Sequence, residues 1–166
     1  LIPGLEGELT AGDGPPARLA GDVALGLIIC KDLDFPGLVR DDRGAGATIL
    51  LAPAWDMDDD GWLHSRMAIV RGVESGISIA RAGRKGLLTI SDPRGRVRAE
   101  QDAVRDPDAV IVAEVPSVVP PTPYARIGDV FAWLCVAAVV VLVVLASSRS
   151  RRAQPAHQSV GDRPPR

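Results

Sequence analysis

Residues 130–146 form a run without a single charged side chain, and this run most limits how the chain can fold. As an α-helix it would measure about 26 Å at a rise of ~1.5 Å per residue, which is enough for the hydrocarbon core of a bilayer. The alternative is a buried helix of a soluble protein; the run is apolar all round and follows a proline-rich stretch, which favours a membrane span. Trp133, near its start, suits a membrane interface. We therefore expect a transmembrane helix over residues 130–147.

The sequence on either side of this run predicts a linker and a tail. Residues 116–129 are rich in proline at their start, which predicts a semi-rigid, extended linker. Residues 148–166 contain Arg149, Arg151 and Arg152 near their start and continue as a polar, proline-bearing stretch that we expect to be disordered. By the positive-inside rule these arginines place the C-terminus in the cytoplasm and the preceding domain across the membrane.

Charge and cysteine content exclude several classes of protein. The net charge is −2, with 19 basic and 21 acidic residues, so the chain has no electrostatic footprint for nucleic acid. Its two cysteines are Cys30 and Cys135, and the second lies inside the apolar run. We therefore expect neither a disulfide framework nor a metal site. The chain begins at Leu1 without a signal-peptide pattern, and we expect it to be the C-terminal part of a longer protein.

Residues 22–115 alternate between apolar strand patterns and helical patterns. Two expected helices cover residues 37–42 and 62–75, the second with Asp60 as its N-cap. Residues 1–21 are expected to form a loop because glycine, proline and acidic residues dominate them. The expected strands cover residues 23–29, 48–52, 77–80, 87–90, 97–99 and 110–115. This order predicts an α/β layered domain.

Cys30 is the candidate nucleophile, because it stands where a buried apolar strand gives way to charged residues. A thiol at the C-terminal end of such a strand is well placed for nucleophilic catalysis. The alternative is a small buried side chain with no chemical role, which is a frequent fate of a free cysteine. The strand pattern alone leaves both open.

Several segments together resemble the nitrilase superfamily, and in particular its apolipoprotein N-acyltransferase branch. Residues 1–6 match the family loop that carries a glutamate, here Glu6, and residues 29–36 match the segment around the nucleophile, here Cys30. Ala54-Trp55 matches part of an Asp-Ala-Trp segment. The most branch-specific match is Thr-Pro-Tyr-Ala-Arg-Ile-Gly-Asp at residues 122–129, entering a hydrophobic helix. The resemblance extends to about Ser147.

This resemblance implies a fold and a catalytic triad. The fold would be the C-terminal part of an α-β-β-α sandwich, over residues 1–115, followed by one transmembrane helix. The family triad is Glu, Lys and Cys, of which this chain holds only Cys30, so the chain alone is expected to be inactive. Glu6 would orient the missing lysine and help to hold the amine. Lys31 is not expected to replace that lysine, because neighbours on an extended segment point in opposite directions.

The resemblance also implies a reaction and its partners. Cys30 would take an acyl chain from a phospholipid as a thioester and pass it to the N-terminal cysteine amine of an apolipoprotein. The enzyme would lie in the bacterial plasma membrane with its catalytic domain outside the cytoplasm. The resemblance implies no cofactor and no metal.

Some positions depart from the branch or have two interpretations. Lys31-Asp32 stands where the branch more often has Tyr-Glu, and Ala52-Pro53 stands where it has Asn-Asp. Asp32, Trp55 and Arg84 are candidate substrate contacts or site-shaping residues. Trp55 also suits core packing, and Arg84 with Lys85 also suits a solvated turn. We expect Glu74 to form a structural ion pair, with Arg81 as its candidate partner, and His64 also suits a plain helix surface.

Two other functions stay open at this point. The first is a membrane-anchored carbon–nitrogen hydrolase of the amidase or nitrilase type, in which water replaces the amine. The second is a membrane-tethered binding domain without catalytic activity.

Overall fold

The computed structural model describes residues 17–19, 21–57, 60–117 and 120–152. Glu6 and the rest of residues 1–16, together with residues 153–166, lie outside the described residues. The chain forms two units, Leu1–Gly128 and Asp129–Arg166, and each is described by itself.

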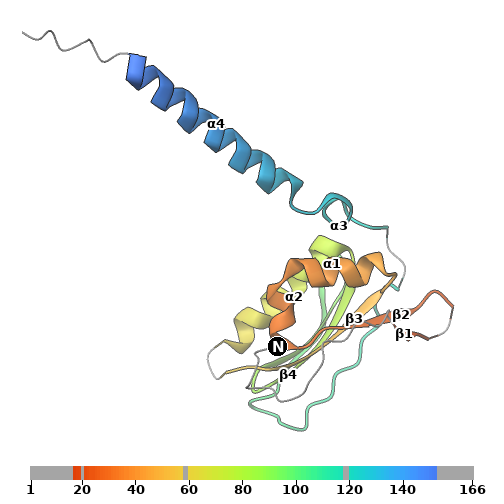
Figure 1. The fold of residues 1–166 in the computed structure, drawn as a ribbon. Coiled ribbons are helices and arrows are strands. Elements are labelled where there is room, and N and C mark those ends of the chain that lie inside the picture. Colours follow the sequence, from red (N-terminus) through yellow and green to blue (C-terminus); the bar gives the residue numbers. More distant parts are fainter. Residues whose placement is uncertain (1–16, 20, 58–59, 118–119, 153–166) are drawn as a thin grey trace, which may run out of the picture. The chain divides into compact units, whose positions relative to one another are not determined.

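The first unit is built on a six-stranded sheet whose strands lie side by side in chain order (Figure 1). Strands β2, β3 and β4 are parallel, and the other neighbours are antiparallel. The carboxyl ends of β2, β3 and β4 therefore meet at one edge, where α/β folds place their ligands. The strands are β1 (Ala17–Arg18), β2 (Ala24–Leu27), β3 (Ile49–Trp55), β4 (Ser78–Arg84), β5 (Leu87–Ser91) and β6 (Val97–Asp102).

Helices form the crossovers between the parallel strands. A 3₁₀ helix, η1 (Cys30–Asp34), and α1 (Pro36–Gly44) connect β2 to β3, and α2 (Gly61–Ser75) connects β3 to β4. Pro36 stands at the start of α1, where its missing N–H is harmless. Helix α2 ends at Gly76, whose φ of 66° is in the left-handed region that favours glycine.

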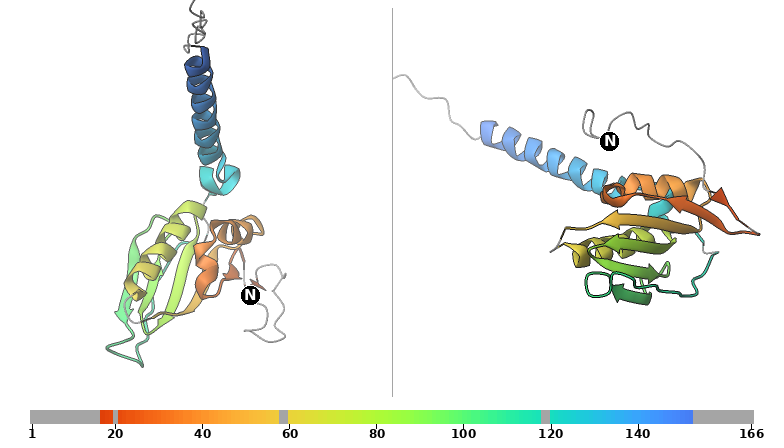
Figure 2. Two further views of the ribbon diagram at one scale, coloured as in Figure 1. Left: turned by 60° about the vertical axis from the view of Figure 1, so that its left-hand side comes forward. Right: turned by 90° about the horizontal axis from the view of Figure 1, so that it is seen from below.

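The core lies between one face of the sheet and the two helices, α1 and α2 (Figure 2). Leu50 and Ala52 of β3 are fully buried there, together with Val39 of α1 and Ala68 of α2. Side chains on a strand alternate between faces, so Leu51 points to the other face, where it is 36% exposed. One face of the sheet is thus covered by helices, and the other carries exposed apolar side chains.

Most expected elements are present, with shifted ends, and one expected strand is wrong. The patterns at residues 37–42 and 62–75 correspond to α1 and α2, and those at 23–29, 48–52, 77–80, 87–90 and 97–99 correspond to β2–β6. Residues 110–115 form no strand, because no described strand pairs with them. Their apolar composition predicts a strand, but a strand also needs a neighbour for its backbone hydrogen bonds. Residues 17–18, expected as loop, form the short β1.

The expected extended linker contains a short helix, α3 (Pro123–Ile127). The Thr122 hydroxyl accepts a hydrogen bond from the Ala125 N–H at 3.0 Å, which caps this helix. The same hydroxyl donates to the carbonyl oxygen of Glu74 in α2. Part of the stretch is therefore helical and attached to the first unit instead of being extended.

The second unit contains one long helix, α4 (Val130–Arg152). Its segment Val130–Ser148 has a mean hydropathy of 2.9 and is long and apolar enough to cross a membrane. The helix continues to Arg152, so the first residues of the expected disordered tail are helical.

The turn between β5 and β6 is organised by the buried carboxylate of Asp92. It accepts hydrogen bonds from the N–H groups of Arg94 and Arg96 at 2.9 and 3.0 Å, and from Nη2 of Arg98 at 2.7 Å. Burial alone would raise the pKa of Asp92, but these hydrogen bonds and the Arg98 charge outweigh it and lower the pKa. The ionised form of Asp92 therefore stabilises the folded state.

We expect Asp92→Asn to lower the free energy of unfolding at neutral pH by about 1–3 kcal/mol, because charge-assisted hydrogen bonds are lost. Since the folded-state pKa is lowered, the Asp92 contribution is complete above the unfolded-state pKa of about 3.9. It disappears as the pH falls through the folded-state value. Urea denaturation of both proteins from pH 7 downwards should show their difference shrinking in acid. Asp108→Asn, on an exposed residue, is the control, and a difference that stays constant with pH would contradict this account.

Candidate active site

Cys30 lies at the carboxyl edge of the parallel strands, as the first residue of η1. Its φ is 49°, a left-handed conformation that is unusual for a residue with a Cβ. The neighbouring turn holds it there: the Ile29 N–H donates to Oδ2 of Asp32, and the Asp32 N–H donates to the Ile29 carbonyl, both at 3.0 Å. Such strain costs about 1–3 kcal/mol and occurs often at functional sites. Cys30 is thus presented on a tight, fixed turn.

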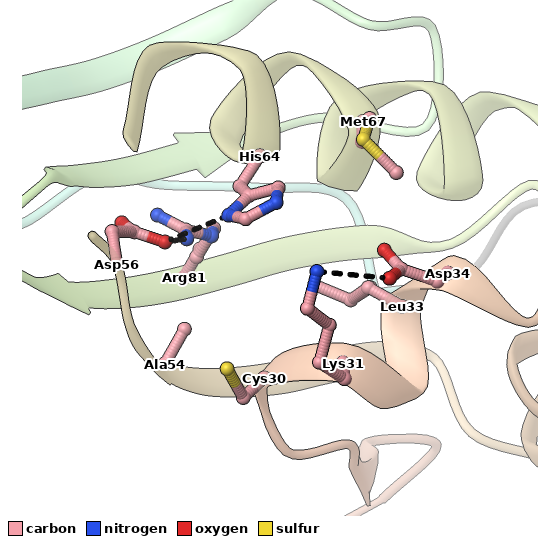
Figure 3. A pocket seen from close by; sticks show the side chains of 9 residues that line it. All are labelled: Cys30, Lys31, Leu33, Asp34, Ala54, Asp56, His64, Met67 and Arg81. Atoms are coloured by element: carbon pink, nitrogen blue, oxygen red, sulfur yellow. Dashed lines mark hydrogen bonds and ion pairs between the residues drawn. The ribbon is translucent and has the colours of Figure 1, made fainter. Parts of the chain in front are cut away.

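The Cys30 thiol opens into a pocket between η1, the carboxyl end of β3, β4 and α2 (Figure 3). Sγ of Cys30 donates a weak hydrogen bond to the carbonyl oxygen of Trp55 at 3.7 Å, and the residue is partly exposed. The interpretation of Cys30 as a sealed core residue is therefore wrong for this structure. The lining residues are Cys30, Lys31, Leu33, Asp34, Ala54, Asp56, His64, Met67 and Arg81.

A buried ion pair forms one wall of this pocket. Asp56 follows β3, and its Oδ1 accepts a hydrogen bond from Nη2 of Arg81 in β4. The two side chains are 0% and 1% exposed. Nη1 of Arg81 also donates to the Leu87 carbonyl at 3.1 Å, and Nδ1 of His64 lies 3.2 Å from Oδ1 of Asp56. Removal of either partner would leave a buried charge uncompensated, which is strongly destabilising.

The other carboxylate oxygen of Asp56 faces three glycines, Gly61, Gly83 and Gly86. A Cβ at Gly86 would overlap Oδ2 and Cγ of Asp56, and a Cβ at Gly83 would stand within contact of both Oδ2 and the Arg81 guanidinium. The Asp56 carboxylate thus occupies the space that side chains at these positions would fill.

Asp56, Asp60 and His64 bring three metal-ligand atoms within 4.8 Å of one another. Other groups already use them: the Arg81 guanidinium pairs with Asp56, and Oδ1 of Asp60 accepts a hydrogen bond from the Met57 N–H at 2.9 Å. A guanidinium beside the carboxylate supplies the positive charge that a metal would bring. The arrangement is therefore explained as an ion-pair network. Asp60 stands at the expected N-cap of α2, but its carboxylate binds Met57 instead of capping the helix.

The other candidate residues, Asp32, Trp55 and Arg84, do not line the pocket. Asp32 holds the Cys30 turn and does not line the pocket. Trp55 does not belong to the core, since it is 58% exposed. The guanidinium carbon of Arg84 lies 4.4 Å from the centroid of the Trp55 ring.

Lys31 lines the same pocket as Cys30, so the expectation that it points the opposite way is wrong. That expectation assumed an extended backbone, whereas residues 30–34 form a 3₁₀ helix. Nζ of Lys31 lies 3.4 Å from Oδ2 of Asp34. The expected pair of Glu74 with Arg81 is also wrong, because Glu74 pairs with Arg71 on its own helix.

The sequence did not predict the Asp56–Arg81 ion pair or the contact of His64 with Asp56. One signal was available: Arg81 stands between Ile79-Ala80 and Ala82-Gly83, and a charge inside a buried strand requires a partner. The partner could not be chosen from the sequence, because several aspartates follow β3.

Comparison with known proteins finds sequence relatives that share one name. No family model matches the sequence. Proteins named apolipoprotein N-acyltransferase from Geobacter metallireducens and Caulobacter vibrioides are 32% and 30% identical to this chain, over 86% and 89% of its length. The one from Bradyrhizobium diazoefficiens is 33% identical over 70% of the chain. The chain spans only 29%, 28% and 22% of these three relatives.

Among solved structures, this chain is similar to a cysteine-to-alanine mutant of an amidase of the nitrilase superfamily from Nesterenkonia. It is 27% identical, with a TM-score of 0.47, over 56% of this chain and 39% of that chain. Nit3 from Saccharomyces cerevisiae is likewise 27% identical, with a TM-score of 0.45, over 48% of this chain and 33% of that chain.

The sequence relatives share one name, and the structure places a cysteine at the carboxyl edge of an α/β sheet. The chain belongs to the apolipoprotein N-acyltransferase family over the segment that it spans.

We expect Gly86→Ala to lower the free energy of unfolding by about 1–3 kcal/mol, the usual cost of overpacking, because its methyl group would displace Asp56. Gly37→Ala, in α1 where the added methyl group would meet open space, is the matched control and should cause no loss. Urea denaturation of both variants measures the difference. Equal stability of the two variants would show that the Asp56 site is not closely packed.

Proposed function

We propose that this chain is the C-terminal part of a membrane-bound N-acyltransferase that matures lipoproteins. The observation that carries the proposal is the Cys30 thiol, held in a left-handed turn and lining a small pocket beside a buried ion pair. The names of the sequence relatives supply the class of reaction.

In the proposed first half-reaction the Cys30 thiolate attacks the carbonyl carbon of a phospholipid acyl ester. A carbon–sulfur bond forms, the ester carbon–oxygen bond breaks, and the lysophospholipid leaves as an alcohol after taking a proton. In the second half-reaction the N-terminal amine of the apolipoprotein attacks the thioester, loses a proton and forms an amide, and the thiol returns. This is a ping-pong scheme with a covalent intermediate.

Groups outside the described residues complete the proposed mechanism. The family triad needs a lysine and a glutamate in addition to Cys30, and Glu6 would orient that lysine and help to hold the amine. A lysine ammonium near Cys30 would favour the thiolate, which is the reactive form of the thiol. The backbone N–H after Cys30 would stabilise the oxyanion of the tetrahedral intermediate.

The proposed location is the bacterial plasma membrane, with α4 as an anchor. Donor and acceptor are both lipids in this proposal, so anchoring raises the effective concentration of one near the other. The arginines at the end of α4 favour a cytoplasmic C-terminus and therefore a catalytic domain outside the cytoplasm.

We expect Cys30→Ala in the complete protein to reduce acyl transfer by at least about 10⁴-fold, as loss of a covalent nucleophile does in other enzymes. The assay follows a labelled acyl chain from phospholipid to a lipopeptide that bears a diacylglyceryl-modified N-terminal cysteine. Cys135→Ala, on an exposed residue of α4, is the control and should keep its activity. Residues 1–166 alone should show no turnover.

Two results of this assay, run beside a separate assay of ammonia release from small amides, would contradict the proposal. Ammonia release from small amides without acyl transfer would identify a carbon–nitrogen hydrolase. Neither reaction from the complete, folded protein would leave a membrane-tethered binding domain.

For the orientation, we expect protease added outside spheroplasts to cut the first unit and to spare an epitope tag placed after Arg166. The reason is the positive-inside rule applied to the arginines at the end of α4. Immunoblotting of the tag gives the readout, and detergent-permeabilised cells, in which the tag should be lost, give the control. A tag that is cut in intact spheroplasts would invert the orientation.

A further inference from the structure

The imidazole ring of His64 extends from α2 into the pocket that the Cys30 thiol lines. Both residues line this pocket, and Figure 3 shows the ring across it from Sγ of Cys30. The His64 side chain is 20% exposed. The cavity volume is about 10 Å³, which is room for about one water molecule. Because a general base acts directly or through one water, a proton can pass between the thiol and the ring across this pocket.

The Asp56 carboxylate fixes the orientation of this ring. Nδ1 of His64 lies 3.2 Å from Oδ1 of Asp56 and 3.6 Å from Oδ1 of Asp60. A carboxylate only accepts hydrogen bonds, so Nδ1 is the donor in these contacts. The Asp56 side chain is itself fully buried and paired with Arg81. In the neutral ring the lone pair is therefore on the other nitrogen, Nε2.

Nε2 of His64 makes no hydrogen bond or ion pair among the described residues. The charged groups that line the pocket around the ring are already paired with one another. They are Lys31 with Asp34, and Arg81 with Asp56. Among the described residues of this pocket, Nε2 is therefore the nitrogen that is left to take up a proton.

The Cys30 thiol needs such a base in order to react. Its Sγ donates to the Trp55 carbonyl oxygen at 3.7 Å, and a carbonyl oxygen cannot carry the proton away. A nucleophile, a base and a third group that orients the base are the general requirement for activating a thiol or hydroxyl. Cys30, His64 and Asp56 supply these three groups in one pocket.

We propose that His64 carries the transferred protons during the reaction of Cys30. This inference rests on the proposed function. In the first half-reaction Nε2 takes the thiol proton as the carbon–sulfur bond forms. It gives this proton to the lysophospholipid oxygen as the ester carbon–oxygen bond breaks.

The second half-reaction uses the same nitrogen. Nε2 takes a proton from the amine of the apolipoprotein as the carbon–nitrogen bond forms, and returns it to sulfur as the carbon–sulfur bond breaks. The ring is neutral again after each half-reaction, so one histidine serves both.

Acyl transfer by the complete protein tests this role. We expect His64→Gln to lower kcat by about 10²–10⁴-fold, the usual contribution of general acid–base catalysis. Glutamine keeps an N–H group for Asp56 but cannot carry a proton. His157→Gln, at the other histidine of the chain, is the matched control and should keep the parent rate. A His64→Gln protein with the parent rate would overturn the proposal, because other groups of the family triad would then move these protons alone.

Rescue of His64→Ala by small azoles separates proton transfer from packing. Added imidazole should restore at least about a tenth of the lost rate, since it is a base of the same shape as the missing ring. Pyrazole has almost the same size and is a far weaker base, so it should restore little. Loss of activity that imidazole does not restore, or that pyrazole restores equally, would overturn the proposal.

The parent protein separates this inference from the proposed function. If the parent transfers acyl chains but the His64 variants behave otherwise than expected, this inference alone is wrong. If the parent releases ammonia from small amides instead, the proposed function is wrong, and the same variants and azoles test His64 on that reaction.

Discussion

The buried ion pair between Asp56 and Arg81 is the interaction on which the site depends. It joins the end of β3 to the interior of β4 and forms the wall opposite the Cys30 turn. Two charges removed from water need close pairing, and Arg81 pairs with Asp56 and donates to the Leu87 carbonyl. Nε of Arg81 and Oδ2 of Asp56 are buried without a hydrogen-bond partner among the described residues. The glycines around Asp56 follow from this requirement, because side chains there would push the carboxylate out of place.

The backbone conformation of Cys30 also depends on its surroundings. Its left-handed backbone is tolerated because the Asp32 carboxylate and the β2–β3 crossover fix the turn around it. At Lys31-Asp32, where the chain departs from the branch, the Asp32 carboxylate accepts a hydrogen bond from the Ile29 N–H and does not line the pocket. Trp55 links the thiol to the exposed arginine at the edge of the sheet.

Local patterns in the sequence are enough to predict most of the fold. Alternating and helical periodicities predict β2–β6, α1 and α2, and the charge-free run predicts α4, because these signals depend on near neighbours in the chain. The strand expected at residues 110–115 is wrong because strand formation needs a partner that periodicity does not contain. Cys30 is recognisable from its place at a strand end, whereas the partner of Arg81 and the 3₁₀ turn at Lys31 depend on tertiary contacts.

The central claim is that Cys30 carries the acyl chain during the reaction. Mass spectrometry of the complete protein, incubated with phospholipid and without an acceptor, tests it most directly. The account predicts one acyl group on the peptide that contains Cys30, removable by hydroxylamine as a thioester is. An acyl group on any other residue, or product formed from protein whose Cys30 stays unmodified, would contradict it.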